Sequence, residues 1–426
     1  MSSVGGSRPS EAVQAMEGAG DDSGSRPSEG VRWTVPGASR DAVVQHVGSS
    51  RHEKVVWMDC DPGHDDAMAL ILAGHVGRGA GGVPGRRVCL LGVSTVAGNQ
   101  TVAKCTRNAI STLDAIGLEG VPVVEGLGRP LLSPAALLCP EIHGDCGLEA
   151  PGGGPVFPHS AREPASRRGV LAMFHAIKWA HEALQADGDR AGERVWVVAT
   201  GALTNVAALL LMFPEARDMV RVSFMGGAVG LGNTHPAAEF NIQTDPEAAR
   251  LVLDSGVPCT MVPLEVTHTA LATADVIAGV RDAAHHEPGS DGAVLRERVV
   301  ALLTFFKRTY LEVFGFEDPP LHDPCAVLVL THPELFEGRP MRVDVECEGR
   351  VSRGRTVCDV LGVLKRDANC LVCEAMDVGR FWGEMLGAVA VAEEGLAAAA
   401  RGGGSEASLA HSQWHGWVAT LPDAFK

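Results

Sequence analysis

The sequence predicts an α/β protein built on an open, mostly parallel sheet flanked by helices. Apolar runs that end in glycine or polar residues alternate with helical segments along most of the chain. The clearest of these runs, 55–58, leads directly into four carboxylates within eight residues, Asp59, Asp61, Asp65 and Asp66. Alternation of this kind is typical of parallel strands joined by crossover helices. Open sheets of this class place their functional sites at the carboxyl ends of the strands, where these acids lie.

Each element is expected from a short apolar run for a strand or a longer mixed run for a helix. After the first strand, Pro62 and Gly63 turn the chain, and a helix begins near Ala67. The runs 343–348 and 351–357, separated by Gly349 and Arg350, predict a hairpin. The other expected strands are 88–96, 121–124, 194–199, 220–225 and 259–262, and the other expected helices are 102–116, 169–185, 203–212, 246–255 and 293–314.

Composition divides the chain into one long folded domain and two tails. Residues 1–52 are rich in glycine, serine and proline, which predicts a disordered extension. The segment 53–400 is expected to be a single folded domain. Residues 401–426 begin with a run of glycines and are expected to form a flexible tail, although Trp414 and Trp417 favour weak docking.

Charge and cysteine content exclude several classes of protein. The 426 residues carry a formal net charge of -16, which argues against nucleic-acid binding and against anionic membrane surfaces. We find no secretory signal and no apolar run near the roughly 20 residues of a membrane span. A transit peptide is disfavoured by acidic residues near the N-terminus. The 11 cysteines lack a framework spacing, and Cys370 and Cys373 lie in a strand-like run without a zinc-site partner pair. We therefore expect a cytoplasmic protein with reduced thiols.

The four clustered carboxylates predict a cation site. Carboxylates this close repel one another and raise each other's pKa. A hard cation removes that conflict, and oxygen-rich clusters suit calcium or magnesium. The alternative is a solvated acidic turn, but such a turn does not need a buried strand leading into it.

Further polar residues follow the later strands. Asn99, Thr200 and Met225 end three of them, so all three could meet the acids at one edge of the sheet. His322-Asp323-Pro324 could add a cation ligand and a proton carrier, or could simply start a helix. His143, taken alone, is more typical of a histidine in a surface loop. Asn233, Glu239 and Asn241 combine donors and acceptors, which suits a polyhydroxylated ligand such as a sugar.

Together these residues resemble the nucleoside hydrolases, which cleave the N-glycosidic bond of ribonucleosides. The Asp-x-Asp-Pro-Gly-x-Asp-Asp motif of the family corresponds to Asp59 to Asp66, and the resemblance covers about 54–386. The runs 96–100, 142–145 and 354–359 look most like the pyrimidine-preferring branch, which hydrolyses uridine and cytidine.

The resemblance implies a calcium-dependent enzyme and a role for each matched position. Asp59 would support the loop, and Asp61 would also accept a proton from the attacking water. His322 or His143 would protonate or hydrogen-bond the leaving base. The family is also expected to form homo-oligomers, as a homodimer or homotetramer. The implied calcium ligands are Asp61, Asp66, Asp323 and the carbonyl of Thr200, and the implied ribose contacts are Asp65, Asn99, Met225, Asn233, Glu239 and Asn241.

Alternatives remain open at the level of sequence. The ribose site is generic, so a purine or broad-specificity hydrolase is the second hypothesis. A calcium-dependent nucleoside-binding protein without turnover is a third, and an aspartyl-phosphate phosphatase is a fourth, although it would need a lysine and a differently placed acid pair. The segment 147–150 departs from the family because Glu149 and Ala150 stand where relatives commonly have Asp-Gly.

Overall fold

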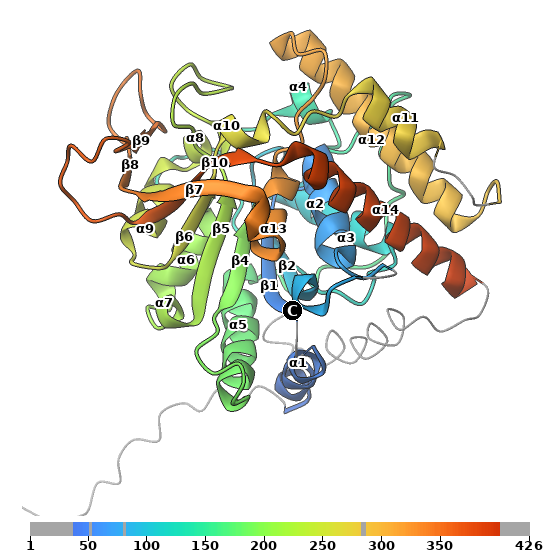
Figure 1. Cartoon of the computed structure of the whole chain (residues 1–426), viewed down its shortest axis with the longest axis horizontal. Helices are drawn as coiled ribbons and strands as arrows, with labels where there is room; N and C mark the ends of the chain where they lie inside the picture. The colour runs from blue at the N-terminus through green and yellow to red at the C-terminus, as the bar shows by residue number, and fades with distance from the viewer. Residues whose placement is uncertain (1–36, 51–52, 80–81, 283–286, 401–426) are drawn as a thin grey trace, which may run out of the picture. The chain divides into compact units, whose positions relative to one another are not determined.

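The computed structural model describes residues 37–50, 53–79, 82–282 and 287–400 (Figure 1). Its centre is an eight-stranded sheet in the order β3-β2-β1-β4-β5-β6-β10-β7. All neighbouring strands are parallel except β10 and β7, which pair antiparallel at one edge. The expected open, mostly parallel sheet is thus confirmed. The strands are β1 (Lys54–Cys60), β2 (Val88–Thr95), β3 (Val123–Glu125), β4 (Val195–Ala199), β5 (Val220–Met225), β6 (Cys259–Val262), β7 (Phe336–Met341) and β10 (Cys370–Met376).

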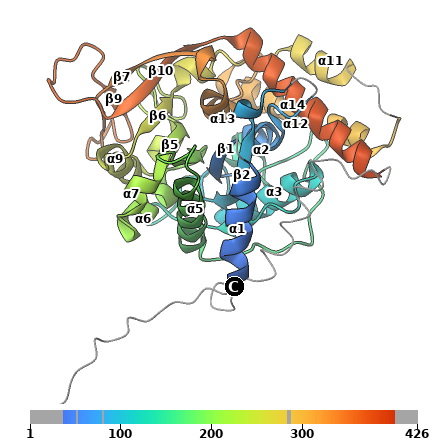
Figure 2. The same ribbon diagram turned by 60° about the horizontal axis from the view of Figure 1, so that its bottom comes forward.

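Helices cover both faces of the sheet (Figures 1 and 2). One buried apolar cluster contains side chains of α2, α3, α12, α13 and α14, and the other contains those of α1, α5, α6 and α9. The longer helices are α1 (Gly37–Ser49), α2 (His64–His75), α3 (Val102–Ala115), α5 (Gly169–Ala186), α6 (Thr204–Met212), α9 (Pro246–Asp254), α11 (Ala274–Asp282), α12 (Asp291–Phe314), α13 (Asp323–Thr331) and α14 (Val378–Ala400). Short helices are α4 (Pro140–His143), α7 (Ala216–Met219), α8 (Phe240–Thr244) and α10 (Leu264–Thr267), with the 3-10 turns Pro84–Arg86 and Pro333–Leu335.

Strand β1 shows why this sequence forms a central strand. Val55 and Trp57 join one apolar cluster, whereas Val56, Met58 and Cys60 join the other. Successive side chains of a strand point to opposite faces, so a continuous apolar run fits a strand that is covered on both sides.

The order of the strands fixes where a site can form. The chain moves outward from β1 through β2 to β3, then returns to β4 on the other side of β1. Loops leaving β1 and β4 therefore diverge and leave a crevice at their carboxyl ends. The crevice is closed at its base by the hydrogen bond from the Thr200 amide to the Asp59 carbonyl (2.8 Å).

Two expectations need correction. Helix α1 lies inside the range 1–52 for which we expected disorder, and its Val43 and Val47 are buried against α5. The expected hairpin exists as β8 (Val343–Val345) and β9 (Thr356–Cys358), but both strands are shorter than expected, because a turn occupies most of the segment assigned to the second strand. Trp414 and Trp417 lie outside the described residues.

Two global features concern the cysteines and the helices. All 11 cysteines are free thiols, and Cys370 and Cys373 belong to β10, as the sequence predicts. Among the described residues, no helix is long and apolar enough to cross a membrane.

Candidate active site

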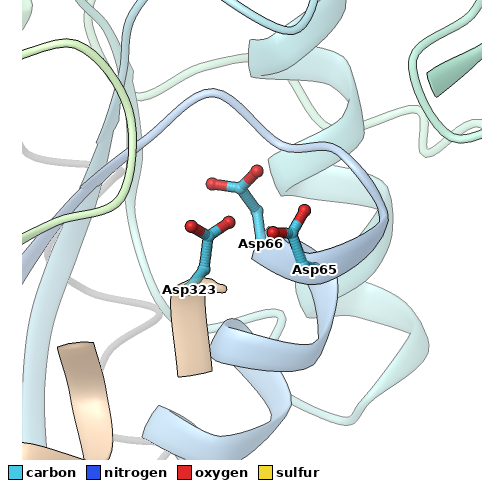
Figure 3. Close-up of side chains that lie close together, drawn as sticks. All are labelled: Asp65, Asp66 and Asp323. Carbon is cyan, nitrogen blue, oxygen red and sulfur yellow. The ribbon is translucent and has the colours of Figure 1, made fainter. Parts of the chain in front are cut away.

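Three carboxylates from two distant segments meet at the carboxyl end of β1. Asp65 and Asp66 lie in the first turn of α2, and Asp323 is the first residue of α13. Their carboxylates lie within 4.8 Å of one another, and all three are buried (Figure 3). Pro324 follows Asp323 in the first turn of α13. The two hypotheses for His322-Asp323-Pro324 are therefore compatible, because the same residues start a helix and aim an acid at the cluster.

Asp66 is the acid of the cluster that accepts the most hydrogen bonds. Its Oδ2 accepts from the Gly63 amide (2.9 Å) and from Asn99 Nδ2 (3.0 Å). Its Oδ1 accepts from Thr200 Oγ1 at 2.8 Å and from the Asp61 amide at 3.3 Å. These bonds fix the carboxylate to both loops of the crevice before any ligand binds.

Asp61 lies next to the three-acid cluster and is only half satisfied. Its Oδ2 accepts from the Asn99 amide at 2.8 Å, whereas its Oδ1 is buried without a partner. A Cβ added at Gly98 would lie 2.0 Å from Oδ2, and one at Gly201 would lie 2.6 Å from Oδ1. Glycine at these two positions therefore allows the backbone of both loops to approach the carboxylate closely.

Asp59 supports the loop from below. Its Oδ1 accepts from Ser94 Oγ and from Asn205 Nδ2, the latter at 2.7 Å. Burial raises the pKa of Asp59 to about 7, although both hydrogen bonds act in the opposite direction. Asp59 does not line the active-site cavity, and the supporting role that the resemblance implies for it stays a prediction.

Burial and mutual repulsion raise the pKa values of the clustered acids. Burial is the largest cause that raises the pKa of Asp61, and the charge of Asp66 adds to it. Burial and Asp66 likewise raise the pKa of Asp65 to about 8. Burial and the other three acids raise the pKa of Asp323 well above its usual value. Four mutually repelling carboxylates with an unpartnered oxygen form an all-oxygen donor set, so the residues present fit a hard divalent cation.

The wall beside the acids is polar and held by α8. Glu239 caps α8, and its carboxylate accepts from the amides of Asn241 (2.9 Å), Gly227 (2.9 Å) and Ile242 (3.1 Å). Asn241 Nδ2 donates to the carbonyls of Thr200 (2.7 Å) and Met225 (3.2 Å). Burial raises the pKa of Glu239 to about 7, against the effect of its three amide donors.

Another part of the site carries a histidine between two hydroxyl groups. His322 Nδ1 lies 2.8 Å from Thr267 Oγ1, and its Nε2 lies 2.8 Å from the Tyr310 hydroxyl. Burial lowers the pKa of His322 well below its usual value and raises that of Tyr310 well above. At neutral pH the pair is therefore a neutral imidazole and a protonated phenol joined by one hydrogen bond.

His143 is held on α4 by a second histidine. His143 Nδ1 lies 3.2 Å from His64 Nδ1, and His64 Nε2 lies 3.0 Å from the Glu149 carbonyl. Burial lowers the pKa of His143 well below its usual value. The contact to residue 149 uses the backbone, so the departure from Asp-Gly leaves this support intact. His143 is buried, which corrects the surface-loop interpretation.

One cavity collects most of the residues that the sequence singles out. Asp61 and Asp66 do not line it. Sequence reasoning missed Phe306, Tyr310 and Phe314, whose spacing of four residues along α12 places them on one face. Tyr310 is the only tyrosine of the chain, which was an unused signal. The residues expected from the sequence that line the cavity are Asp65, Asn99, His143, Thr200, Met225, Asn233, Glu239, Asn241, His322 and Asp323.

A buried carboxylate cluster that faces proton-carrying groups suits hydrolysis better than binding alone, so fold and site indicate a hydrolytic enzyme. Comparison with known proteins identifies the family. The model of the inosine-uridine preferring nucleoside hydrolases matches residues 56–383, and the chain belongs to this family. It is a ribonucleoside hydrolase, and the resemblance seen in the sequence is confirmed.

The alignments cover almost the whole length of each relative. A probable ribonucleoside hydrolase of Dictyostelium discoideum is 39% identical over 339 residues, which cover 78% of this chain and 94% of that protein. The pyrimidine-specific ribonucleoside hydrolase RihB of Escherichia coli O157:H7 is 36% identical over 333 residues, 78% of this chain and 95% of that protein. Among solved structures, the purine-preferring ribonucleoside hydrolase from Gardnerella vaginalis has a TM-score of 0.67 at 28% identity and covers 80% of this chain and 100% of that one.

Proposed function

We propose that this enzyme hydrolyses the N-glycosidic bond of uridine and cytidine with the help of calcium, giving the free base and ribose. The observation that carries the proposal is a single cavity with a carboxylate cluster, a polar wall and an imidazole–phenol wall. The pyrimidine preference is further supported by the 36% identity to the pyrimidine-specific relative.

Calcium would be held by the carboxylates of Asp61, Asp66 and Asp323 and by the carbonyl of Thr200. The unpartnered Oδ1 of Asp61 and the raised pKa values of the acids support this assignment. When bound, the cation would neutralise the acids, anchor ribose hydroxyls and acidify a water molecule. Asp61 would also accept a proton from the water that attacks the anomeric carbon.

The ribose would lie between the acids and α8. Asp65 would accept hydrogen bonds from the 2′- and 3′-hydroxyls, and Asn99 and Asn241 line the same space. Glu239 would bring negative charge toward the oxocarbenium-like sugar, which stabilises the positive charge that develops as the bond breaks. Met225 and Asn233 would close the side of the sugar away from the base.

The base would leave toward the aromatic wall, which is formed by His322, Tyr310 and the neighbouring phenylalanines of α12. A departing pyrimidine is an anion unless it gains a proton, so a donor lowers the barrier. Both ring nitrogens of His322 are engaged, one of them by Tyr310. The Tyr310 hydroxyl would therefore donate its proton to the base and regain one from solvent, while the neutral His322 holds the hydroxyl in place. His143 would hydrogen-bond the base.

A purine or broad-specificity hydrolase is the second candidate, because the Gardnerella vaginalis enzyme with the same fold is described as purine-preferring. The deciding experiment compares kcat/KM for uridine, cytidine, inosine and adenosine. We expect uridine and cytidine to lead, and leadership by inosine would overturn the pyrimidine preference but not the hydrolase activity.

The metal assignment is tested on the same substrates after chelation. Chelated enzyme should release no ribose from uridine, and calcium should restore the release. Asp61→Ala should abolish the release even when calcium saturates the protein. Ribose release at the original rate from chelated enzyme, or from Asp61→Ala, would contradict the proposal.

We further propose that the enzyme forms a homodimer or homotetramer. A monomer mass in light scattering would exclude both.

A further inference from the structure

A second cleft lies at the opposite end of the sheet from the active site. It is lined at the amino ends of β1, β4 and β5, by Lys54, Arg194, Trp196 and Arg221, together with the loop 191–193 that follows α5. In Figure 1 the active-site helices α4, α8 and α10 lie toward the top, whereas the end of α5 that leads into the loop 191–193 lies at the bottom.

The cleft concentrates positive charge that no acid neutralises. Neither Lys54 nor Arg221 takes part in an ion pair with any described residue, and Arg194 donates only to the Arg217 carbonyl at 3.3 Å. Glu193 is the only acid in the lining, and its Oε2 accepts from both Nε and Nη2 of Arg190, at 3.3 and 2.9 Å. Three cations therefore share one cleft of a chain whose formal net charge is -16.

One of the cations is held in place, and a second lies beside it. The Arg221 guanidinium lies over the Trp196 ring, 3.9 Å from its centroid. This stacking occupies one face of the guanidinium and leaves its in-plane N–H groups free to bind a planar or tetrahedral oxyanion. Arg194 lies close enough to Arg221 that its charge, after burial, lowers the pKa of the Arg221 side chain.

The wall of the cleft is built by hydrogen bonds rather than by a loose loop. Arg190 is 5% exposed and donates to the carbonyls of Ser50 (3.1 Å) and Glu53 (2.8 Å). The Gln185 side chain accepts from the Gly192 amide at 3.0 Å and donates to the Glu193 carbonyl at 3.0 Å. The lining is therefore pre-formed, which lowers the entropic cost of binding a ligand.

We propose that this cleft binds the phosphate group of a small molecule through Lys54, Arg194 and Arg221. Two guanidinium groups and an ammonium group at one place match the charge and the oxygen geometry of phosphate. An anion there would relieve the repulsion between Arg194 and Arg221, which no acid in the lining compensates.

The test measures binding of inorganic phosphate and of ribose 5-phosphate to the full-length enzyme by calorimetry, in 150 mM sodium chloride. The double variant Arg194→Gln/Arg221→Gln is compared with Arg339→Gln/Arg366→Gln, which removes the same charge from residues paired with Glu374 and Asp344. Neither pair belongs to the active site, so uridine hydrolysis should be unchanged in both and reports intact folding.

We expect saturable binding of at least one of the two probes to the wild type and to the control variant. The cleft variant should bind at least about tenfold more weakly, because each lost pairing is a charge-assisted hydrogen bond. Tighter binding of ribose 5-phosphate than of phosphate would identify a phosphomonoester as the ligand, and equal binding would identify the free ion. Absence of saturable binding by either probe below about 10 mM, or equal loss in both variants, would overturn the proposal.

Discussion

At the scale of single residues, the partners of His322 decide how the leaving base can gain a proton. Thr267 and Tyr310 occupy its two ring nitrogens, so neither nitrogen is free to reach a substrate directly. Tyr310 lines the cavity and has its pKa raised by burial. A phenol kept protonated at this place is suited to donate a hydrogen bond to a developing anion.

This role can be tested with two substrates. Tyr310→Phe and His322→Gln should lower kcat for uridine by roughly 10²- to 10⁴-fold, the usual range for a lost proton donor. With 4-nitrophenyl riboside, whose leaving group departs as a stable anion, the loss should be only a few-fold. Phe314 belongs to the same wall but has no proton to donate, so Phe314→Leu should lower kcat for both substrates alike. Equal losses of Tyr310→Phe on both substrates would show that the hydroxyl only positions the substrate.

A glycine beside Asp61 gives a second test at this scale. Gly201→Ala would place a Cβ 2.6 Å from Asp61 Oδ1, which displaces the carboxylate. We expect calcium affinity, measured by calorimetry, to fall by about 10- to 100-fold, as for other changes that disturb the support of a metal ligand. Gly383→Ala, which meets nothing within 4 Å, should leave the affinity unchanged. An unaltered affinity in Gly201→Ala would argue against Asp61 as a ligand.

At the scale of elements, the packing of α12 on α14 positions the aromatic wall. Arg296 on α12 donates to both carboxylate oxygens of Glu393 on α14, with the Nε bond at 2.8 Å. Both residues are buried. A buried pair of this kind costs much desolvation, so its net stabilisation is small, but removal of one partner leaves a buried charge.

This asymmetry predicts a double-mutant result. Glu393→Met should lower the free energy of unfolding by about 3–5 kcal/mol in urea titrations. Arg296→Met/Glu393→Met should recover most of that loss, because no unpaired charge remains. Glu374→Met, from the exposed pair with Arg339, should cost about 1 kcal/mol or less. A double variant as unstable as Glu393→Met would show that packing, not the buried charge, dominates.

At the scale of the whole molecule, the acid cluster links stability to pH and to metal. The pKa values of Asp59 and Asp65 are raised by burial, to about 7 and about 8, and those of Asp61 and Asp323 are also raised. A raised carboxyl pKa stabilises the fold below the pKa of the unfolded chain, near 3.9. That contribution is lost as pH rises through the folded-state values. The chelated protein should therefore become less stable between about pH 4 and pH 8.

Calcium should reverse this trend, because it binds the deprotonated acids. We expect the rise in Tm on adding saturating calcium to the chelated enzyme to be small at pH 5 and larger at pH 8. Thermal unfolding over this range, with sodium chloride of equal ionic strength as the control, measures it. A rise in Tm that is independent of pH, or largest at pH 5, would show that calcium does not bind at these acids.

Most elements could be predicted because they depend on local patterns. The apolar run of β1 and the Pro62-Gly63 turn define a strand and a helix start wherever the chain folds. Helix α1 was missed because its segment is rich in small and polar residues, and it is Val43 and Val47 packing on α5 that bury it. Likewise, nothing local marks β7, which becomes a strand by pairing antiparallel with β10.

The sequence by itself determined the family, the parallel α/β sheet and the acids, amides and histidines that the site would need, because these are encoded in short motifs and in hydrophobic periodicity. The family resemblance already implied that Asp323 joins the cluster, and the structure brings it to Asp65 and Asp66. Only the tertiary structure decided that Tyr310 and Thr267 engage His322, and that His64 supports His143. These contacts join segments far apart in the chain, and burial in the assembled crevice sets the pKa values of the groups. Burial and distance depend on how all the elements pack, and no local pattern carries that information.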